Sequence, residues 1–329
     1  MAEFFYNRAT DSAFNLALEE LLVKDVTDEL FFLWQNSPAV IIGRNQNTLA
    51  EINTDFIRAN NINVTRRNTG GGAVYHDLGN INYSYITNFE EGRSINFADF
   101  AIPVIKTLAE LGITAEFSGR NDILIGGKKI SGSAQSRIGN RILFHGTLLY
   151  DSNIENLVNA LNVSKVKISG KGIASVRSRV TNIKEHLSQN LTVEDFINAI
   201  SNSLRKQFNV VSDYAVPQKI TEKAASLANT KYRTTEWNYG NSPEFNYEKS
   251  AKFTGGNVTL SLNIRKGIII SADFSGDFFS RTDVAILEQM LTNADLSLTN
   301  ISNILESLPL SEMFLNITQD EILSLFPTL

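Results

Sequence analysis

Cysteine is absent from the 329-residue sequence, and this absence removes several kinds of chemistry at once. Disulfide bonds, thiolate zinc sites and cysteine nucleophiles are all excluded. The sequence also lacks any apolar run close to the roughly 18 residues that a membrane-spanning helix requires. Its first residues show no basic segment followed by an apolar one, as a secretory signal would. We therefore expect a cytoplasmic protein with no membrane partner.

An excess of positive charge is also missing. Lys and Arg together number 30 against 35 Asp and Glu, so the formal net charge is −5. Binding to the phosphate backbone of nucleic acids needs a basic surface, so nucleic acid is not expected as the main partner. With 43% hydrophobic residues, a chain of this length can bury a large core and is predicted to form two domains.

Three common catalytic motifs are missing as well. No histidine pair has the H-x₃-H spacing of a zinc site, and no G-x-S-x-G sequence provides a serine nucleophile. The phosphate-binding loop G-x-x-x-x-G-K-[ST] does not occur either. Metallohydrolase and serine hydrolase activities are therefore not expected. A nucleotide would have to be held by a different arrangement of glycine, arginine and lysine.

Residues 66–80, with the sequence RRNTGGGAVYHDLGN, are the best candidate for such an arrangement. Three consecutive glycines lose much conformational entropy on folding, so they indicate a backbone with positive φ or a close approach to a ligand. Their N–H groups can form an anion-binding concavity. Arg66 and Arg67 add planar donors that match phosphate oxygens. We interpret the stretch as a cradle for phosphate and carboxylate; a glycine-rich hairpin turn with solvated arginines is the alternative.

A second glycine-rich stretch covers residues 119–135 and is predicted to be a hairpin. A short strand, a Gly-Gly-Lys turn and a returning strand of small residues leave room for a ligand against the backbone. Another strand follows at residues 141–150. Of three histidines, His76 and His145 lie in glycine-flanked strand segments, whereas His186 lies in a polar loop or helix end. A histidine in a strand is often a core residue, but this placement favours function for the first two.

The remaining elements provide the scaffold. Asp11 is a plausible N-cap for a helix whose apolar residues recur with helical spacing up to Leu22. Turn residues at 236–243 predict a domain boundary. Further predicted elements are strands at 31–34, 39–42 and 82–86, helices at 97–111, 153–161, 193–208 and 219–231, a basic loop with Lys165, Lys167 and Lys171, then a hairpin at 257–272 and helices at 281–291, 301–308 and 318–326.

Several motifs in register resemble the lipoate-protein ligases. They are TGGGAVYHDLGN, GRND followed by KISGSA, FHGTLL, and SVRSRVTN at 175–182, and the resemblance covers most of residues 10–185. It implies an α+β fold related to the class II synthetase and biotin ligase catalytic domain, a mixed sheet with flanking helices. The length and placement of the last residues resemble the small α+β C-terminal domain of the long-form ligases. We expect a catalytic domain at 1–245 and an accessory domain at 246–329.

The resemblance also implies roles for individual residues. Lys129 would be catalytic, touching both the lipoyl carbonyl and the α-phosphate. Asp122 would orient Lys129 or help to place Mg²⁺. Contacts to ATP and lipoyl-AMP would come from Arg67, Gly70, Gly71, Gly72, Ala73, Val74, Tyr75, Asn80, Asp122 and Lys129; contacts to lipoate would come from Glu19, Trp34, Arg66, His76, Lys129 and His145.

The activity implied is ATP-dependent activation of lipoate to lipoyl-AMP. Transfer of the lipoyl group would follow, to one lysine of a lipoyl domain of a 2-oxoacid dehydrogenase complex or of the glycine-cleavage H protein. An octanoyl or lipoyl transferase on the same fold is an alternative, but those relatives use a cysteine nucleophile, and this sequence has none. A non-catalytic lipoate binder is a further alternative.

Overall fold

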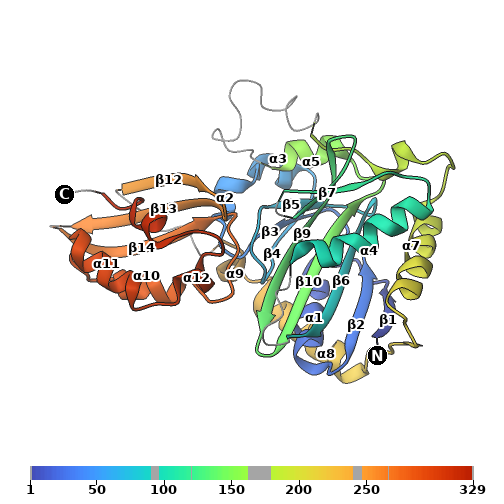
Figure 1. Cartoon of the computed structure of the whole chain (residues 1–329), viewed down its shortest axis with the longest axis horizontal. Coiled ribbons are helices and arrows are strands. Elements are labelled where there is room, and N and C mark those ends of the chain that lie inside the picture. Colours follow the sequence, from blue (N-terminus) through green and yellow to red (C-terminus); the bar gives the residue numbers. More distant parts are fainter. Residues whose placement is uncertain are drawn as a thin grey trace.

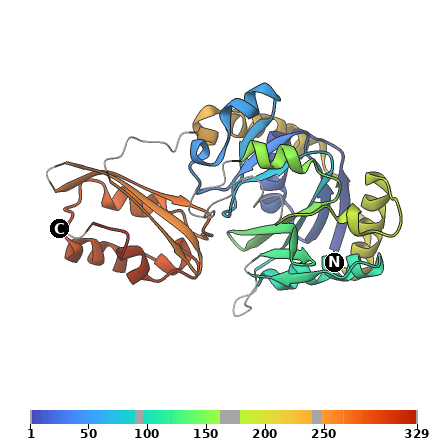
Figure 2. The ribbon, with the colours of Figure 1, turned by 90° about the horizontal axis from the view of Figure 1, so that it is seen from above.

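The computed structural model describes residues 2–89, 96–119, 121–161, 179–239, 247–265 and 267–327. A large part that contains the N-terminus lies beside a smaller part that contains the C-terminus (Figures 1 and 2). The basic loop predicted around Lys165, Lys167 and Lys171 lies outside the described residues, as does part of the predicted boundary at 236–243. Among the described helices, none is both long and apolar enough to cross a membrane.

An eight-stranded mixed sheet forms the centre of the large part. Strands β1 and β11 run parallel to their neighbours, whereas the pairs from β2 onward are antiparallel. In order across the sheet, the strands are β11 (Ser212–Asp213), β1 (Ala2–Asn7), β2 (Glu29–Trp34), β6 (Asn80–Asn88), β10 (Arg141–Leu149), β9 (Lys128–Ile138), β8 (Asp122–Ile125) and β7 (Glu116–Ser118).

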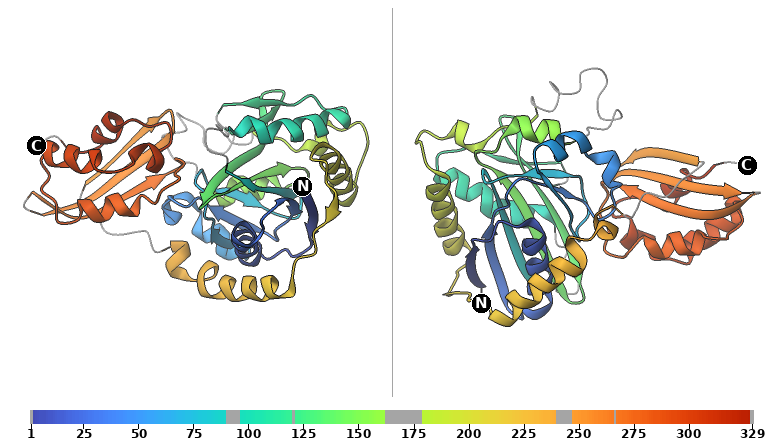
Figure 3. Two further views of the ribbon diagram at one scale, coloured as in Figure 1. Left: turned by 60° about the horizontal axis from the view of Figure 1, so that its bottom comes forward. Right: turned by 180° about the vertical axis from the view of Figure 1, so that it is seen from behind.

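Both faces of this sheet are covered by helices, because its central strands are apolar on both sides. On β2, Phe31 and Leu33 point into the core beneath α4 (Phe97–Glu110) and α7 (Val193–Gln207). Phe32 and Trp34 point into the opposite core, beneath α1 (Ser12–Asp25) and α8 (Gln218–Leu227), as the two-residue period of a strand requires. The left view of Figure 3 shows α4 and α8 on opposite sides of the sheet.

A separate three-stranded sheet carries the predicted cradle. Its strands are β3 (Ala39–Ile42) in the middle, β4 (Asn63–Arg66) parallel to it and β5 (Val74–His76) antiparallel to it. The three glycines therefore connect two strands that flank the same neighbour. Short helices pack around this sheet: α2 (Thr48–Glu51), α3 (Thr54–Ala59), α5 (Ile154–Ala160) and α9 (Thr235–Tyr239). The turn η2 (Ile183–His186) and the π-helical turn η3 (Ala228–Tyr232) belong instead to the two cores of the large sheet.

The small part, or small domain, has a hydrophobic core of its own, formed by residues between Val258 and Phe326. The predicted hairpin is present as β13 and β14, and Thr318 caps the last helix through a capping box with Glu321. The elements are β12 (Tyr247–Phe253), β13 (Gly256–Arg265), β14 (Ile268–Gly276), α10 (Ala285–Leu291), α11 (Leu298–Glu306), α12 (Leu310–Met313) and α13 (Gln319–Leu323).

The predicted fold class is confirmed: a mixed sheet with flanking helices is followed by a small α+β unit. The helix predicted at 97–111 is α4, capped by Asn96 and Asp99 at its start and followed by Gly112 at φ +81°. The sequence reading missed β1, which lies inside the large sheet, and β12, whose polar residues do not alternate clearly with apolar ones. The helix predicted to begin at Arg281 begins at Ala285.

Candidate active site

A cavity of about 410 Å³ opens between the two sheets, and most of the predicted site residues line it. One end has an apolar wall from α1, β2, β3 and β5. The other end is polar and includes charged groups from β8, β9 and the small domain. Leu16, Trp34, Ile41 and Val74 form the apolar wall, and Asn121, Asp122, Lys129, Arg179 and Asp277 lie at the polar end.

Lys129 lies at the polar end, held in place by Asp122. Its Nζ is 2.7 Å from Asp122 Oδ1 across the β8–β9 hairpin. The turn that makes this hairpin consists of Gly126 at φ +54° and Gly127 at φ +76°, a backbone conformation that glycine adopts readily. The Lys129 side chain passes over Gly132: a Cβ atom there would be 2.8 Å from the ammonium nitrogen. The pairing with Lys129 supports an orienting role for Asp122.

The backbone of Lys129 is held from a distant part of the chain. Its N–H donates to Arg179 O at 2.7 Å, and its carbonyl accepts from Thr181 N at 3.1 Å. Arg179 also lines the cavity. Lys129 and Val180 therefore form an isolated parallel β-bridge, which brings the end of the SVRSRVTN motif to the hairpin.

Arg67 lies beneath the glycines and fixes their direction. Its Nη2 donates to the carbonyl oxygens of Gly70 and Gly72, at 2.6 and 2.9 Å. Because the C=O and N–H groups of a trans peptide point in opposite directions, the N–H groups of Gly71 and Ala73 point away from Arg67. Gly71, at φ +90°, donates instead to Phe278 O of the small domain at 3.5 Å. The N–H group of Ala73 thus faces away from Arg67, as a cradle for anions requires, whereas that of Gly71 is bonded to the small domain.

The other two nitrogens of Arg67 also donate hydrogen bonds inside the protein. Its Nη1 donates to Ile41 O at 3.1 Å and its Nε to Thr69 Oγ1 at 2.9 Å. Burial lowers the pKa of this guanidinium to about 10, so it stays charged at neutral pH. We therefore interpret Arg67 as the residue that organises the cradle from below, in addition to lining the cavity.

Arg66 is not brought to the cavity. It was expected to contact lipoate, but alternation along β4 turns its side chain toward the other side of the sheet, where it is buried. Burial lowers its pKa to about 10. Its guanidinium donates to Gly43 O, Arg44 O, Gln46 O, Thr48 Oγ1, Trp237 O and Asn238 O at 2.6–3.3 Å, which makes it a structural clamp.

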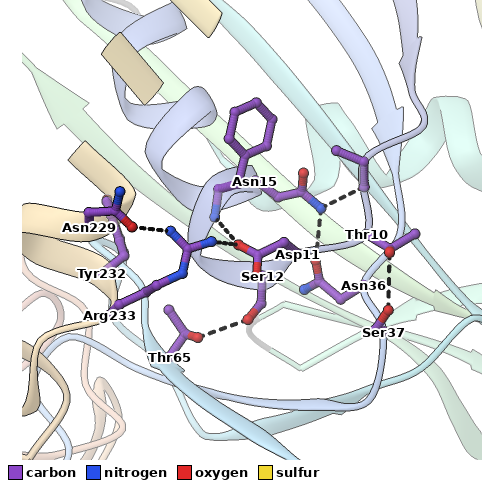
Figure 4. Close-up of polar contacts among 12 residues, drawn as sticks. Thr10, Asp11, Ser12, Asn15, Asn36, Ser37, Thr65, Asn229, Tyr232 and Arg233 are labelled. Carbon is purple, nitrogen blue, oxygen red and sulfur yellow. Dashed lines mark hydrogen bonds and ion pairs between the residues drawn. The ribbon is translucent and has the colours of Figure 1, made fainter. Parts of the chain in front are cut away.

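His76 lines the apolar end beside Trp34, with ring centroids 6.3 Å apart in an edge-to-face arrangement. Its Nδ1 lies 3.0 Å from Asn36 Nδ2. Figure 4 shows the amide of Asn15 that in turn binds Asn36. Burial lowers the pKa of His76 to about 3, with help from the charge of Arg67, so the ring is neutral at physiological pH. His76 is therefore a wall of the slot and not a proton carrier.

His145 lines the cavity too, whereas four other expected residues do not reach its surface. Glu19 lies behind His145, with its carboxylate oxygens 3.0 Å from His145 Nδ1. Gly70 packs against Phe278 and Phe279 of the small domain. Tyr75 and Asn80 are buried in the scaffold: Tyr75 joins the core beneath α5, and Asn80 Nδ2 donates to Asn82 Oδ1 at 3.0 Å.

The sequence reading missed several lining residues. Asn121 and Arg179 lie within the motifs that were recognised, so each could have been named from its place beside an assigned residue. Asp277 comes from the small domain, and no motif pointed to it. Gly132, Ser133 and Ala134 line the cavity, as the small side chains of β9 predicted.

A protein-built metal site is not found in the described part of the chain. No three His, Asp or Glu side chains come together there as ligands, and the carboxylate of Asp122 is paired with Lys129. These residues do not fit a resident Mg²⁺ ion held by the protein alone.

A two-domain adenylate-forming ligase is the class of protein that this fold and cavity define, and comparison with known proteins identifies its family. Residues 11–205 match the model of the lipoyl protein ligase A/B catalytic domain. Residues 242–326 match the model of the bacterial lipoate protein ligase C-terminus. The chain belongs to the lipoate-protein ligase family.

Full-length relatives agree with this assignment. The lipoate-protein ligase LplJ of Bacillus subtilis is 44% identical over 322 residues, which cover 96% of each chain. The solved structure of LipL1 of P. falciparum in complex with lipoate has a TM-score of 0.79 at 27% identity and covers 98% of this chain and 97% of that one. A solved lipoate-protein ligase A bound with ATP has a TM-score of 0.63 at 26% identity and covers 73% of this chain and 98% of that one.

Proposed function

We propose that this protein activates lipoate with ATP to form lipoyl-AMP and then transfers the lipoyl group to a lysine of an acceptor protein. One observation carries the proposal: a single cavity joins an apolar slot to an anion cradle, and Lys129 lies at the polar end. The relatives support it, since a homologous structure contains lipoate and another contains ATP.

In the first half-reaction, a carboxylate oxygen of lipoate attacks the α-phosphorus of ATP. The bond from this phosphorus to the bridging oxygen breaks, and pyrophosphate leaves. The outward N–H group of Ala73 would bind a phosphate oxygen, and the ammonium of Lys129 would offset the charge that grows on the α-phosphate.

In the second half-reaction, the amine of the acceptor lysine attacks the acyl carbonyl. The bond from the acyl carbon to the phosphate oxygen breaks, AMP leaves with that oxygen, and the amine loses a proton. Negative charge passes through the acyl oxygen, which would lie near the same ammonium. The slot beside Trp34 and His76 would hold the acyl chain, which gains about 0.8 kcal/mol for each buried CH₂.

Other features of the reaction are also proposals. Mg²⁺ would enter with the ATP phosphates, because it binds substrate oxygens and water readily. Lipoyl domains of 2-oxoacid dehydrogenase complexes and the glycine-cleavage H protein are the acceptors we propose. The cytoplasmic location stays a prediction from the sequence.

The proposal is tested by mass measurement. The full chain is mixed with lipoate, Mg²⁺-ATP and an apo lipoyl domain, and the acceptor should gain one lipoyl group. No gain should occur without ATP. In a control mixture, an octanoylated donor protein takes the place of ATP and lipoate. Acyl transfer in this control, without transfer in the first mixture, would instead identify a transferase.

A further inference from the structure

Glu19 lies on α1 immediately behind the wall of the cavity and is 3% exposed. It is not part of the cavity lining. Its carboxylate accepts a hydrogen bond from Ser84 Oγ at 2.6 Å, and His145 Nδ1 lies 3.0 Å from both of its oxygens. A buried carboxylate is costly unless it is hydrogen-bonded, and here Ser84 and His145 provide the hydrogen bonds. Any effect of Glu19 on a substrate must therefore pass through these neighbours.

One set of contacts leads from Glu19 to the apolar end of the cavity. Trp34 Nε1–H donates to Ser84 Oγ at 2.9 Å, and the Ser84 hydroxyl donates to Glu19. Trp34 is part of the wall that would hold the acyl chain. The orientation of the Trp34 ring therefore depends on the Glu19 carboxylate through the Ser84 hydroxyl.

A second set of contacts leads to the cradle. His145 Nε2 lies 2.9 Å from Thr69 Oγ1, and Arg67 Nε donates to the same oxygen at 2.9 Å. Arg67 in turn holds the two glycine carbonyls that turn the cradle outward. The charge on Glu19 also opposes the lowering of the Arg67 pKa by burial.

The direction of each hydrogen bond in this network follows from the carboxylate at its centre. An ionised Glu19 can only accept, so Ser84 and His145 Nδ1 must both donate to it. Thr69 Oγ1 accepts from Arg67, which leaves the Thr69 hydroxyl proton for His145 Nε2. In this arrangement every donor has an acceptor, and a neutral amide, with one oxygen and one NH₂ donor, would be a poorer acceptor for both Ser84 and His145.

We propose that Glu19 is a positioning residue for both the acyl slot and the phosphate cradle. It orients the slot through Ser84 and Trp34. It orients the cradle through His145, Thr69 and Arg67. The inference rests on the proposed function, since it places the acyl chain in the slot and the phosphates on the cradle. Glu19 touches neither substrate, yet both binding steps depend on it.

The test is calorimetric titration of the full chain with lipoate alone and with α,β-methylene-ATP alone, an analogue that cannot release pyrophosphate. Glu19→Gln should weaken the binding of both ligands by roughly tenfold, the usual effect of losing a hydrogen bond to a charged group. Ser84→Ala should weaken lipoate and spare the analogue. Thr69→Val should weaken the analogue and spare lipoate.

The control is Glu29→Gln. Glu29 is a carboxylate on β2 that also accepts from two hydroxyls, of Tyr85 and Thr87, but it lies outside the cavity lining. Both affinities of this variant should equal those of the wild type. If Glu19→Gln fails to fold, the opposite selectivity of Ser84→Ala and Thr69→Val still tests the two arms.

Two results would overturn the inference. Glu19→Gln could weaken lipoate and leave the analogue unchanged, which would mean a direct contact with the acyl chain. Ser84→Ala and Thr69→Val could each weaken both ligands equally, which would mean a general loss of structure. Failure of the wild type to bind either ligand would instead overturn the proposed function.

Discussion

Gly132 provides the sharpest test of how the site is built, because a new methyl there would clash with the ammonium end of Lys129. A Cβ at this position would lie 2.8 Å from Lys129 Nζ and 3.0 Å from its Cε. Ordinary contacts begin at 3.4 Å, so the ammonium must move by about 0.6 Å or leave its position. Gly132 does not have a positive φ, so alanine fits its backbone.

The expected effect of Gly132→Ala is therefore on the reaction and not on folding. The ammonium of Lys129 is the flexible end of a long side chain and can move at little cost. A Gly→Ala change at a compatible position stabilises the fold by about 0.4–1 kcal/mol. The 2.7 Å pairing of Lys129 with Asp122 would be lost or lengthened. Misplacement of a catalytic group by about 1 Å can slow a reaction by roughly 10²-fold, so we expect a loss of about tenfold to a hundredfold.

The assay follows pyrophosphate release from lipoate and ATP, together with the thermal unfolding midpoint. Gly132→Ala should lower the rate while the midpoint stays the same or rises. Gly112→Ala is the control: its φ is +81° and its surroundings are open, so it should unfold at a lower temperature with an unchanged rate. A wild-type rate for Gly132→Ala would show that Lys129 does not act from the position seen here.

Three further predictions concern the cradle, the sheet and the small domain. Arg67→Lys should weaken binding of α,β-methylene-ATP more than binding of lipoate, because one ammonium nitrogen cannot replace the four contacts that the three guanidinium nitrogens make to Gly70, Gly72, Ile41 and Thr69; equal losses would contradict this. Gly146→Ala should lower stability by about 1–3 kcal/mol, since its Cβ would lie 2.3 Å from Tyr83 Oη in a packed core; an unchanged unfolding midpoint would refute the clash. Burial raises the pKa of Glu288 from 4.5 to about 7, so its protonated form stabilises the fold and that stabilisation is lost as the pH rises from about 4.5 through 7. Glu288→Gln should accordingly raise the unfolding midpoint at pH 8 relative to the wild type and leave it similar at pH 4, whereas an equal shift at both pH values would contradict the assignment.

The parts of the site that the sequence predicted are those that lie close together along the chain. Lys129 and the small residues after it share one strand, and the glycines follow Arg67 directly, so their neighbours could be inferred from order and turn chemistry. The role of Arg66 could not be inferred in this way. It depends on which face of β4 meets the loop after β3, and two adjacent arginines look alike in a sequence.

Long-range contacts explain the other differences. Glu19 was expected at the ligand from the family resemblance, but its distance from the cavity depends on how α1 packs against β6 and β10. Asp277 and Phe278 meet the cradle from the small domain, and nothing local in the sequence indicates such a contact. Strand β12 was missed because its exposed polar residues give no periodic signal.

The central claim, that one cation serves both half-reactions, is tested most directly by Lys129→Ala in two separate assays. One measures lipoate-dependent pyrophosphate release, and the other measures transfer to an apo lipoyl domain from supplied lipoyl-AMP. Removal of one such donor typically costs about 2.7–4 kcal/mol, so each rate should fall by roughly 10² to 10³, whereas Lys128→Ala, which changes an exposed neighbour, should leave both within a few-fold. Near-normal rates for Lys129→Ala in both assays would contradict the account.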